Sequence, residues 1–453
     1  MLGLNRRLKD LQSEGKQIKI GIAGLGQMGS SMAVHVNSLA GMKIAAAADL
    51  DVNNAAGILK NAGYGEDDLA LVEAAIRISP ENRGSEVIKS GSGMYPAIEK
   101  AIGSGKMVVT DDIGILTAIE DIDVVADATG HPEAGARIAF AAISNKKHMV
   151  TFNVEADTTI GPILKRMADN SGTVYTVAAG DEPAAALELF DMADALGLDI
   201  VAAGKGKNNP LDKEANPESL AEYAAKKGSS AKMMTSFVDG TKSMFEMACL
   251  SNATGLVPDT RGMHGAKVDV AGLTQKYRLK KDGGILSRKG VVEFAIGDIA
   301  PGVFLVYTSE LKIIRDELKY LLFGDGPNYL LYRPYHLTSI EAPLSAARAF
   351  FYGEPTIVPI SGLVSEVVTY AKKDLEKGDV LDGIGMFTIY GMIEHYSIAA
   401  DEGLLPLGLS QGARLVNNIE KGAPITYKDV ELVQDSTILQ LRRLQDGMKF
   451  QGR

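Results

Sequence analysis

The stretch Gly24-Leu25-Gly26-Gln27-Met28-Gly29 decides the fold, because it directly follows an apolar run, Ile18 to Ala23, and precedes a helical pattern. In such a setting Gly24 permits a tight turn, Gly26 lets the backbone approach a pyrophosphate, and Gly29 lets the helix pack closely on the strand. The phosphates would lie at the positive N-terminus of that helix. The alternative is an ordinary glycine-rich turn. The spacing predicts a Rossmann domain that contacts a dinucleotide through Gly24, Gly26, Gln27, Met28 and Gly29.

Asp49 supports this interpretation and bears on the choice of cofactor. It follows the second apolar run, Lys43 to Ala48, and stands 20 residues after Gly29, where an acidic residue bonds the ribose 2′-hydroxyl. A carboxylate there repels a 2′-phosphate, and no arginine occurs in residues 50–55, which favours NAD over NADP. A loop elsewhere could supply a cation for the 2′-phosphate, so the predicted cofactor is written NAD(P).

The first half of the chain alternates strand-like apolar runs with helical patterns, which is typical of a parallel α/β sheet. The predicted strands are Ile18 to Ala23, Lys43 to Ala48, Met107 to Val109, Ile122 to Ala126, His148 to Thr151, Thr173 to Val177 and Leu198 to Ala203. Residues 64–106 are interpreted as a mainly helical insertion. The predicted fold class is α/β, with a doubly wound parallel sheet of the Rossmann type.

Polar residues and glycines follow nearly every predicted strand. In an open parallel sheet, ligands bind at the carboxyl ends of the strands, so these segments are expected to converge. Loops at strand ends are often polar for no functional reason, which explains part of the pattern. The segments are Thr110 to Asp112, Thr129 to His131, Asn153 with Glu155, Gly180 to Glu182, and Gly204 to Asn208. Among these residues, Thr129, Gly130 and Asn153 are predicted to contact the cofactor.

The pattern changes in the second half. Strand-like runs arrive in a block at Val291 to Ile296, Val303 to Tyr307 and Tyr329 to Tyr332, which predicts an antiparallel sheet in an α+β catalytic and dimerisation domain. In the tail, residues 375–381 and 419–425 share an apolar residue followed by Glu-Lys-Gly, which predicts two similar β-turns in a small β-rich module. We expect three domains: residues 1–155, 156–354 and 355–453.

Composition excludes several function classes. The 453 residues carry a formal net charge of −10 and a pI of about 5.3, which disfavours nucleic acid and anionic membranes as partners. The only cysteine, Cys249, excludes an internal disulfide and suits the cytoplasm. No apolar run approaches the ~20 residues of a membrane span, and the polar N-terminus does not resemble a secretory signal. The expected partner is a small-molecule substrate.

Two lysines flanking a glycine, Lys205 and Lys207, make a candidate anion or carbonyl site, with Asn208 beside them. Lys242, Glu246 and Cys249 share one face of a predicted helix. Lys242 and Glu246 either form a surface pair or line the cleft, with Lys242 as proton donor to a carbonyl that is being reduced.

Four acidic residues could together hold a metal ion: Glu155, Asp157, Asp181 and Glu182. Three of them, Glu155, Asp181 and Glu182, are also candidates for a base. Carboxylate oxygens suit a hard divalent cation, so a magnesium or manganese ion is an open alternative. The catalytic candidates are therefore Lys205, Lys207, Lys242, Glu155, Asp181, Glu182 and Asn208. His264 and His336 are expected to be structural or exposed.

Several of these motifs carry a resemblance to known families. Residues 144–153 resemble the strand-entry segment of homoserine dehydrogenases, although Val154-Glu155 stands where that family has a lysine. A closer resemblance covers nearly the whole chain. The fingerprint, Asn153 to Glu155, Gly180 to Pro183, Gly204 to Asn208 and Glu341 to Pro343 are similar to the 1-deoxy-D-xylulose 5-phosphate reductoisomerase-like (DRL) oxidoreductases. The repeat in the tail, with residues 405–408 between its copies, resembles a SAF module.

The DRL resemblance implies a Rossmann domain, a catalytic domain and a C-terminal SAF module. It also implies a carbonyl reductase or reductoisomerase that acts on a small sugar-like substrate, phosphorylated or not, and a homodimer or homotetramer. The reductoisomerase members use NADPH, which opposes the preference for NAD that Asp49 predicts. Two alternatives stay open: a homoserine-dehydrogenase-like enzyme acting on a semialdehyde, and a non-catalytic nucleotide-sensing protein.

Overall fold

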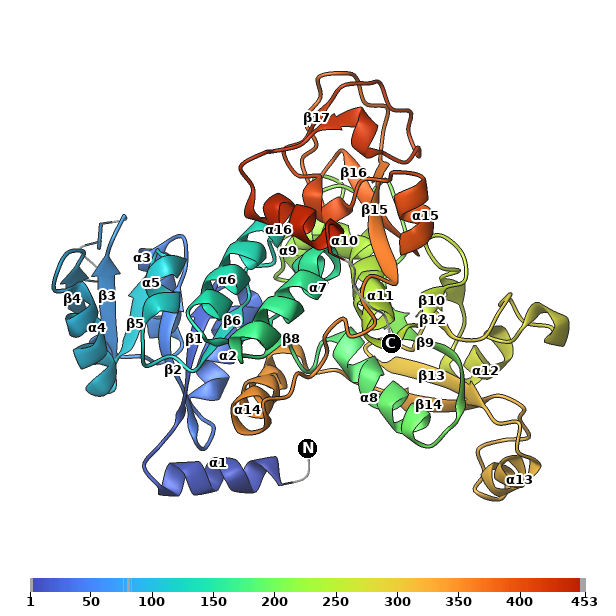
Figure 1. The fold of residues 1–453 in the computed structure, drawn as a ribbon, viewed down its shortest axis with the longest axis horizontal. Helices are drawn as coiled ribbons and strands as arrows, with labels where there is room; N and C mark the ends of the chain where they lie inside the picture. The colour runs from blue at the N-terminus through green and yellow to red at the C-terminus, as the bar shows by residue number, and fades with distance from the viewer. Residues whose placement is uncertain (1–2, 76, 80–81, 83, 449–453) are drawn as a thin grey trace. The chain divides into compact units, whose positions relative to one another are not determined.

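The computed structural model describes residues 3–75, 77–79, 82 and 84–448. The chain divides into two compact units (Figure 1). Unit 1 comprises Met1–Asn153, Ile163–Asp181 and Leu337–Val358, and unit 2 comprises Val154–Pro162, Glu182–His336 and Pro359–Arg453. The predicted boundaries after residues 155 and 354 remain predictions.

Unit 1 is built on an eight-stranded sheet with the order β4-β3-β5-β2-β1-β6-β7-β8, in which every pair is parallel. The chain starts in the middle at β1 and winds outward in both directions, so the predicted doubly wound α/β fold is confirmed. The strands are β1 (Ile18–Ala23), β2 (Met42–Ala48), β3 (Leu69–Glu73), β4 (Glu86–Lys89), β5 (Met107–Thr110), β6 (Val124–Asp127), β7 (His148–Thr151) and β8 (Tyr175–Val177).

The prediction of a mainly helical insertion at residues 64–106 was wrong. This segment contributes β3 and β4, which extend the sheet beyond β5, and among its described residues only α4 (Met94–Gly103) is an α-helix. The residues of β3 are buried and apolar except the last. An apolar run of that length cannot be distinguished from a buried helical turn by periodicity alone.

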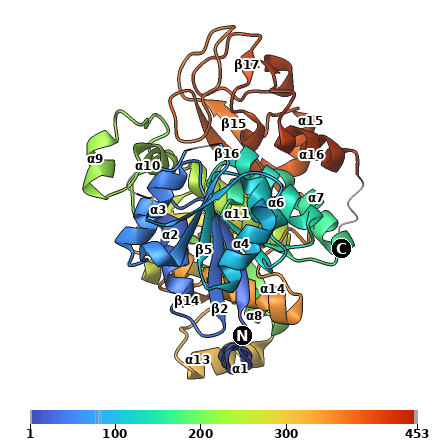
Figure 2. The same cartoon turned by 90° about the vertical axis from the view of Figure 1, so that its left-hand side faces the viewer.

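Helices flank the sheet of unit 1 (Figure 2). They are α1 (Leu4–Ser13), α2 (Gln27–Val36), α3 (Val52–Asn61), α4, α5 (Ile113–Ala118), α6 (Pro132–Ser144) and α14 (Ala342–Tyr352), and α7 (Val154–Ser171) contributes to both units. The chain returns to unit 1 with α14, whose Ala342, Ala346 and Ala347 are fully buried in the same apolar core as Ile18 and Ile20. Small side chains let that helix pack closely on the sheet.

Unit 2 contains a second sheet with the order β10-β12-β9-β13-β14, and β11 pairs with β12. The prediction of an antiparallel sheet was wrong in part: β9 pairs antiparallel with β13 but parallel with β12, so the sheet is mixed. The strands are β9 (Asp199–Lys207), β10 (Val257–Pro258), β11 (Ala266–Lys267), β12 (Val291–Ile296), β13 (Val303–Thr308) and β14 (Tyr329–Arg333). The helices are α8 (Glu182–Ala195), α9 (Ala221–Lys226), α10 (Ala231–Val238), α11 (Thr241–Thr254), α12 (Leu273–Lys276) and α13 (Lys312–Tyr320).

The tail of unit 2 is a small β-rich region in which β15 (Ser365–Ala371) and β16 (Ile389–His395) pair antiparallel (Figure 2). It also holds α15 (Tyr396–Asp401), β17 (Arg414–Leu415), β18 (Val430–Glu431) and α16 (Thr437–Asp446). The two copies of the sequence repeat pair with each other, because Leu375 and Ile419 exchange two backbone hydrogen bonds of 2.9 Å. The repeat is therefore structural, since its copies close the fold of the tail.

Among the residues that the structure describes, none of the helices has both the length and the apolar character that a membrane span requires.

Candidate functional site

The glycine fingerprint forms the turn between β1 and α2 in unit 1. Gly24 has φ of +87°, a conformation that L side chains rarely adopt. A Cβ on Gly29 would lie 1.8 Å from the Gly24 carbonyl oxygen, so the helix packs against the turn without a side chain between them. In contrast, a Cβ on Gly26 would meet no protein atom within 4 Å. Open space therefore lies beside Gly26 at the N-terminus of α2, which is where Rossmann domains hold a diphosphate.

Asp49 lies beside this turn. Its Oδ2 accepts a hydrogen bond of 2.8 Å from the Leu25 backbone N–H, and its Oδ1 accepts one of 3.2 Å from Asp51 N–H. The carboxylate is half-buried at the carboxyl end of β2. The structure thus brings the predicted ribose-binding acid next to the fingerprint, while Gln27 is exposed and Met28 is half-buried at the start of α2.

The turns after β6 and β7 hold the other predicted cofactor residues. The buried Asp127 carboxylate accepts from the Thr129 backbone N–H at 2.9 Å and from its hydroxyl at 2.6 Å. Burial raises the pKa of Asp127, against the opposing effect of these hydrogen bonds. Asn153 is fully buried and donates from Nδ2 to the His131 carbonyl oxygen at 2.8 Å. Thr129 and Asn153 therefore hold the two turns in place through these hydrogen bonds. A Cβ on Gly130 would meet no protein atom within 4 Å.

In unit 2, Lys205 and Lys207 extend from the same face of β9, because alternate residues of a strand share a face. Gly206 between them faces the other side, where a Cβ would lie 2.2 Å from the Ala300 backbone nitrogen. The Lys-Gly-Lys pattern thus places two ammonium groups side by side over a closely packed backbone. The prediction that Leu198 to Ala203 belongs to the parallel sheet was wrong, because β9 lies in the mixed sheet of unit 2. Lys205 and Lys207 lie within β9 and do not follow a strand of the parallel sheet.

Lys205 is held between two carboxylates. Its Nζ lies 2.7 Å from Glu182 Oε1 at the start of α8, and it also pairs with Glu246 of α11. The side chains of Lys205 and Glu246 are 8% and 2% exposed, so this pair is shielded from solvent. Burial alone would lower the pKa of Lys205, but the two carboxylates outweigh it and raise the pKa above its ordinary value. The two carboxylates therefore favour the charged form of Lys205.

Lys207 has a different environment. Its Nζ donates to the Phe237 carbonyl oxygen at 2.6 Å and contacts Asn209. Burial, and then the charge of Lys205, lower the pKa of Lys207 to about 8, although Asp239 and Glu246 oppose them. A buried lysine that titrates near neutral pH can give or take a proton. The predicted Asn208 is exposed, and its neighbour Asn209 contacts the lysine instead.

Lys242 lies in the first turn of α11. Together with Lys205, Lys207 and the carboxylates of Glu155, Glu182 and Glu246, it forms a group of charged side chains that we call the lysine cluster. Lys242 Nζ lies 3.2 Å from Glu155 Oε1, in the first turn of α7, and the two side chains are 19% and 10% exposed. Glu246, one turn further along α11, faces Lys205. The side chains of Lys242 and Glu246 are largely shielded from solvent, so they do not form an exposed surface pair. The interpretation in which both line the cleft stays a prediction. Cys249 follows on α11 and is buried.

Two of the candidate metal ligands, Glu155 and Glu182, pair with lysines. Glu155 and Glu182 each direct an oxygen at a lysine, and an ammonium group competes with a metal ion for such oxygens. Asp157 is fully buried in the segment of α7 that belongs to unit 2, and Asp181 is buried at the end of a segment of unit 1. The magnesium or manganese ion stays a prediction.

The two histidines differ from each other. His264 Nδ1 lies 2.6 Å from Glu293 Oε1, and the hydrogen bond to Glu293 raises the pKa of His264. Its ion-pair partners among the described residues are Asp259 and Glu293, and a structural role is the one expected for it. His336 lies at the cluster, with Nε2 3.5 Å from Glu182 Oε1 and a side chain 14% exposed.

Sequence reasoning missed Asn209, Asp239 and Lys372, which the structure places near the cluster. It treated His336 as structural or exposed. None of these residues belongs to a spacing pattern. The only local signal is at Asp239, which precedes Gly240 and the first turn of α11 as helix-start residues do.

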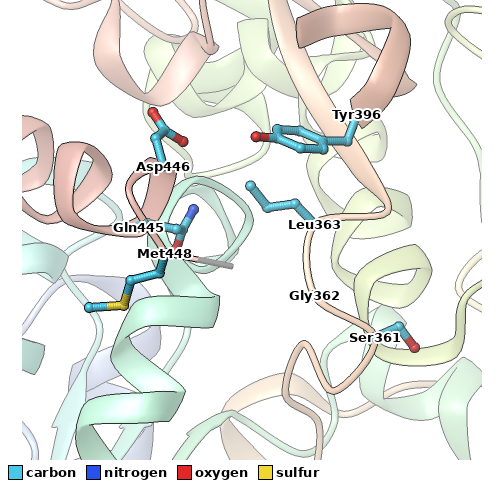
Figure 3. Close-up of a pocket in the computed structure, with 7 residues that line it drawn as sticks. All are labelled: Ser361, Gly362, Leu363, Tyr396, Gln445, Asp446 and Met448. Carbon is cyan, nitrogen blue, oxygen red and sulfur yellow. The ribbon is translucent and has the colours of Figure 1, made fainter. Parts of the chain in front are cut away.

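A cavity of about 180 Å³ lies elsewhere in unit 2, between the loop at 361–363 and the ends of α15 and α16. Figure 3 shows the ring of Tyr396 pointing across it toward the side of Asp446 and Gln445. Its lining residues are Ser361, Gly362, Leu363, Tyr396, Gln445, Asp446 and Met448. None of them is a predicted site residue, and the cavity is smaller than the ~300 Å³ at which ligand pockets begin.

Comparison with known proteins bears on the segment that holds the lysines. Residues 180–342 match the family model described as "Oxidoreductase DRL, catalytic domain". The match confirms the predicted DRL resemblance for this segment, whereas the SAF tail and the homoserine dehydrogenase likeness remain predictions. A search of curated protein sequences finds no match.

Solved structures of similar chains include dehydrogenases. A "probable dehydrogenase" from Thermotoga maritima has 13% identity and a TM-score of 0.38, over 74% of this chain and 90% of that one. A scyllo-inositol dehydrogenase from Lactobacillus casei, solved with NAD(H) and scyllo-inositol, has 15% identity and a TM-score of 0.33, over 70% and 76%. With TM-scores below 0.5, these likenesses decide neither the cofactor nor the substrate.

The assignment therefore rests on the chain itself and on the match to residues 180–342. An oxidoreductase catalytic domain that contains Lys205 and Lys207 is joined to a Rossmann domain with an open dinucleotide fingerprint. The protein is an NAD(P)-dependent oxidoreductase.

Proposed function

We propose that the protein transfers a hydride between NAD(P) and a carbonyl or carbinol carbon of a small sugar-like substrate, and that Lys207 gives or takes the proton at the substrate oxygen. The observation that carries the proposal is the placement of Lys207, buried on β9 beside Lys205, within the segment that matches an oxidoreductase catalytic domain. The bound nicotinamide supplies or accepts the hydride. Gly24, Gly26 and Gly29 shape the diphosphate site, and Asp49 bonds the adenosine ribose.

The lysines have separate roles in this proposal. In reduction, the carbonyl carbon gains a hydride, the electron pair of its double bond moves to oxygen, and Lys207 Nζ donates the proton that completes the alcohol. Lys205 remains charged between Glu182 and Glu246, so it stabilises negative charge developing on the oxygen without giving up its own proton. Lys242, paired with Glu155, would orient the substrate.

The DRL match favours a sugar-like substrate and leaves a skeletal rearrangement before hydride transfer as the narrower proposal. The region of the proposed site has as many lysines as carboxylates. The lysines are Lys205, Lys207, Lys242 and Lys372, and the carboxylates are Glu155, Glu182, Glu246 and Asp239. A homodimer or homotetramer, and the cytoplasm as location, belong to the same proposal.

A cofactor-reduction screen tests this function. Purified protein is assayed with NADH and NADPH against ketoses, ketose phosphates, semialdehydes and small keto acids, with and without magnesium or manganese, and in the reverse direction against polyols. We expect turnover with a sugar-like carbonyl and no requirement for the added metal. Turnover of semialdehydes alone would favour the homoserine-dehydrogenase-like alternative. Tight cofactor binding without turnover of any substrate would favour a nucleotide sensor.

The proposed proton transfer predicts opposite pH dependences for the two directions. The pKa of Lys207 is lowered to about 8, so below that pH the group is an ammonium that can donate. Carbonyl reduction should be constant at lower pH and fall as the pH rises through about 8, whereas alcohol oxidation should rise over the same range. The measurement is kcat against pH in each direction with saturating cofactor. A reduction rate that stays flat from pH 7 to 10 would rule out Lys207 as the donor.

Asp49 predicts the cofactor preference. Its carboxylate repels a 2′-phosphate, so the ratio of kcat/KM for NADH over NADPH should fall about tenfold or more in Asp49→Asn. Asparagine retains an oxygen that can accept from Leu25 N–H, so the turn should stay in place. Asp51→Asn is the matched control, because that residue caps α3 two positions further on. An unchanged ratio in Asp49→Asn would mean that another residue decides between the cofactors.

A further inference from the structure

A buried lysine of the β-rich tail reaches into the region of the lysine cluster. Lys372 directly follows β15, and only 2% of its side chain is exposed. Its Nζ donates to the Ala215 carbonyl oxygen at 2.7 Å and to the Met386 carbonyl oxygen at 2.9 Å, and lies 2.8 Å from Asp239 Oδ2. An ammonium group has three donors. Lys372 therefore joins three segments that are distant in the sequence, and its positive charge is compensated by Asp239.

Two of these segments lead directly to the proposed site. Ala215 lies in the loop that follows β9, the strand that ends at Lys207. Asp239 lies in the turn between α10 and α11, and Lys242 is the second residue of α11. Lys372 thus connects the loop after β9 with the turn before α11. β9 carries Lys207, and α11 carries Lys242.

The turn at residues 237–241 links Lys372 to Lys207 and Lys242 through hydrogen bonds and an ion pair. The Phe237 carbonyl oxygen accepts from Lys207 Nζ at 2.6 Å, and Asp239 Oδ1 accepts from the Thr241 N–H at 2.9 Å. The Thr241 hydroxyl in turn accepts from the Gly391 N–H of β16, in the tail, at 2.9 Å. A shift of this turn would move both the hydrogen-bond acceptor of Lys207 and the start of the helix that carries Lys242.

The same turn also sets the charge that Lys207 experiences. The charged groups that face Lys207 are Lys205, Asp239 and Glu246. Burial raises the pKa of Asp239, and Lys372 opposes this and favours the ionised carboxylate. An ionised Asp239 favours the protonated form of Lys207. Lys372 therefore acts on Lys207 by geometry and, through Asp239, by charge.

We propose that Lys372 is a positioning residue for the oxidoreductase site, and that the β-rich tail contributes to the reaction by fixing the turn at 237–241 through the Lys372–Asp239 pair. This inference rests on the proposed function, because it gives the tail a part in that reaction. It also gives a reason why the tail packs within the same compact unit as the sheet that carries Lys205 and Lys207.

The test compares a double variant with a neighbouring control. Lys372→Met alone would leave the Asp239 carboxylate buried without its partner, which destabilises a fold strongly. Asp239→Asn combined with Lys372→Met removes both charges and should remain folded by circular dichroism. We expect kcat to fall about 10- to 100-fold, because small misplacements of reacting groups have effects of that size. Cofactor affinity should not change. The fall of the reduction rate with pH should begin at a lower pH, because Lys207 loses the charge of Asp239.

Lys373→Met is the matched control, because it makes the same change one residue further on, where the side chain is exposed. It should have wild-type kcat and the wild-type pH profile. A folded double variant that also has wild-type kcat and pH profile would overturn the inference, since the pair would then only stabilise the fold.

A second variant covers the case in which the double variant does not fold. Thr241→Val keeps the shape of the side chain and removes the hydroxyl that accepts from Gly391 N–H. It should keep its melting temperature within a few degrees and lose kcat without a change in cofactor affinity. Wild-type kcat in this variant would overturn the inference. Absence of NAD(P)-linked turnover in the wild-type protein would instead contradict the proposed function itself, and the inference would fall with it.

Discussion

Lys207→Met is expected to lower kcat for carbonyl reduction about 10²- to 10⁴-fold, which is the usual effect of removing a positioned general acid. Methionine is close to lysine in length and has no proton to give, so the packing on β9 should be preserved. Among the described residues, the hydrogen-bond partners of Lys207 Nζ are the Phe237 carbonyl oxygen and Asn209, so its loss should leave no buried acid without a partner. Binding of NADH, measured by fluorescence titration, should stay unchanged because the fingerprint lies in unit 1.

Two further variants make this result specific. Lys227→Met removes an exposed lysine at the end of α9 and should leave kcat unchanged. Lys207→Arg keeps a positive charge at the site but cannot release a proton near neutral pH. It should lose kcat nearly as much as Lys207→Met while it retains more of the substrate affinity. Wild-type kcat in Lys207→Arg would mean that the site needs the charge alone and that the proton comes from elsewhere.

The central part of the fold could be predicted because its signals are local. The order strand, glycine fingerprint, helix and acid between Ile18 and Asp49 fixes one β-α-β unit, and the structure reproduces it. The outer strands could not be identified in the same way. β4 is four residues long with only one of them buried, so it has neither the alternation nor the apolar run that marks a strand. Residues 337–358 belong to unit 1, although most of unit 2 precedes them in the sequence. No motif in these residues indicates which unit they join.

For the candidate site, the sequence predicts which side chains share a face of a strand or helix, but not which side chains pair with one another. The period of two in Lys205-Gly206-Lys207 places both ammonium groups on one face, and the spacing of four between Lys242 and Glu246 places both on one side of α11. The sequence does not reveal which carboxylate pairs with which lysine, because Glu182, Glu246 and Glu155 come from three different helices. These pairings decide that Lys205 stays charged while Lys207 titrates. The difference between the two lysines is therefore a property of tertiary structure.

Gly26→Val is expected to abolish dinucleotide binding while the protein stays folded. The Cβ position at Gly26 meets no protein atom within 4 Å, and its φ of −66° suits any residue, so valine fits in the protein alone. With a cofactor bound, the added side chain would occupy the space that the diphosphate needs against the start of α2. A loss of affinity of at least about 100-fold is expected, or about 3 kcal/mol of binding free energy. Isothermal calorimetry with NADH and NADPH measures it directly.

Thermal unfolding provides the complementary measurement, because a ligand that binds only the folded state raises the melting temperature. NADH should raise that temperature in the wild-type protein and in Gly57→Val, a control substitution at another glycine with open space around its Cα. It should not do so in Gly26→Val. Gly29 would be a poor choice for the same test, because a Cβ there meets the Gly24 carbonyl oxygen at 1.8 Å and would disturb the turn itself. If Gly26→Val binds either coenzyme with wild-type affinity, the diphosphate does not lie at this turn, and the proposed roles of Asp49 and the fingerprint are wrong.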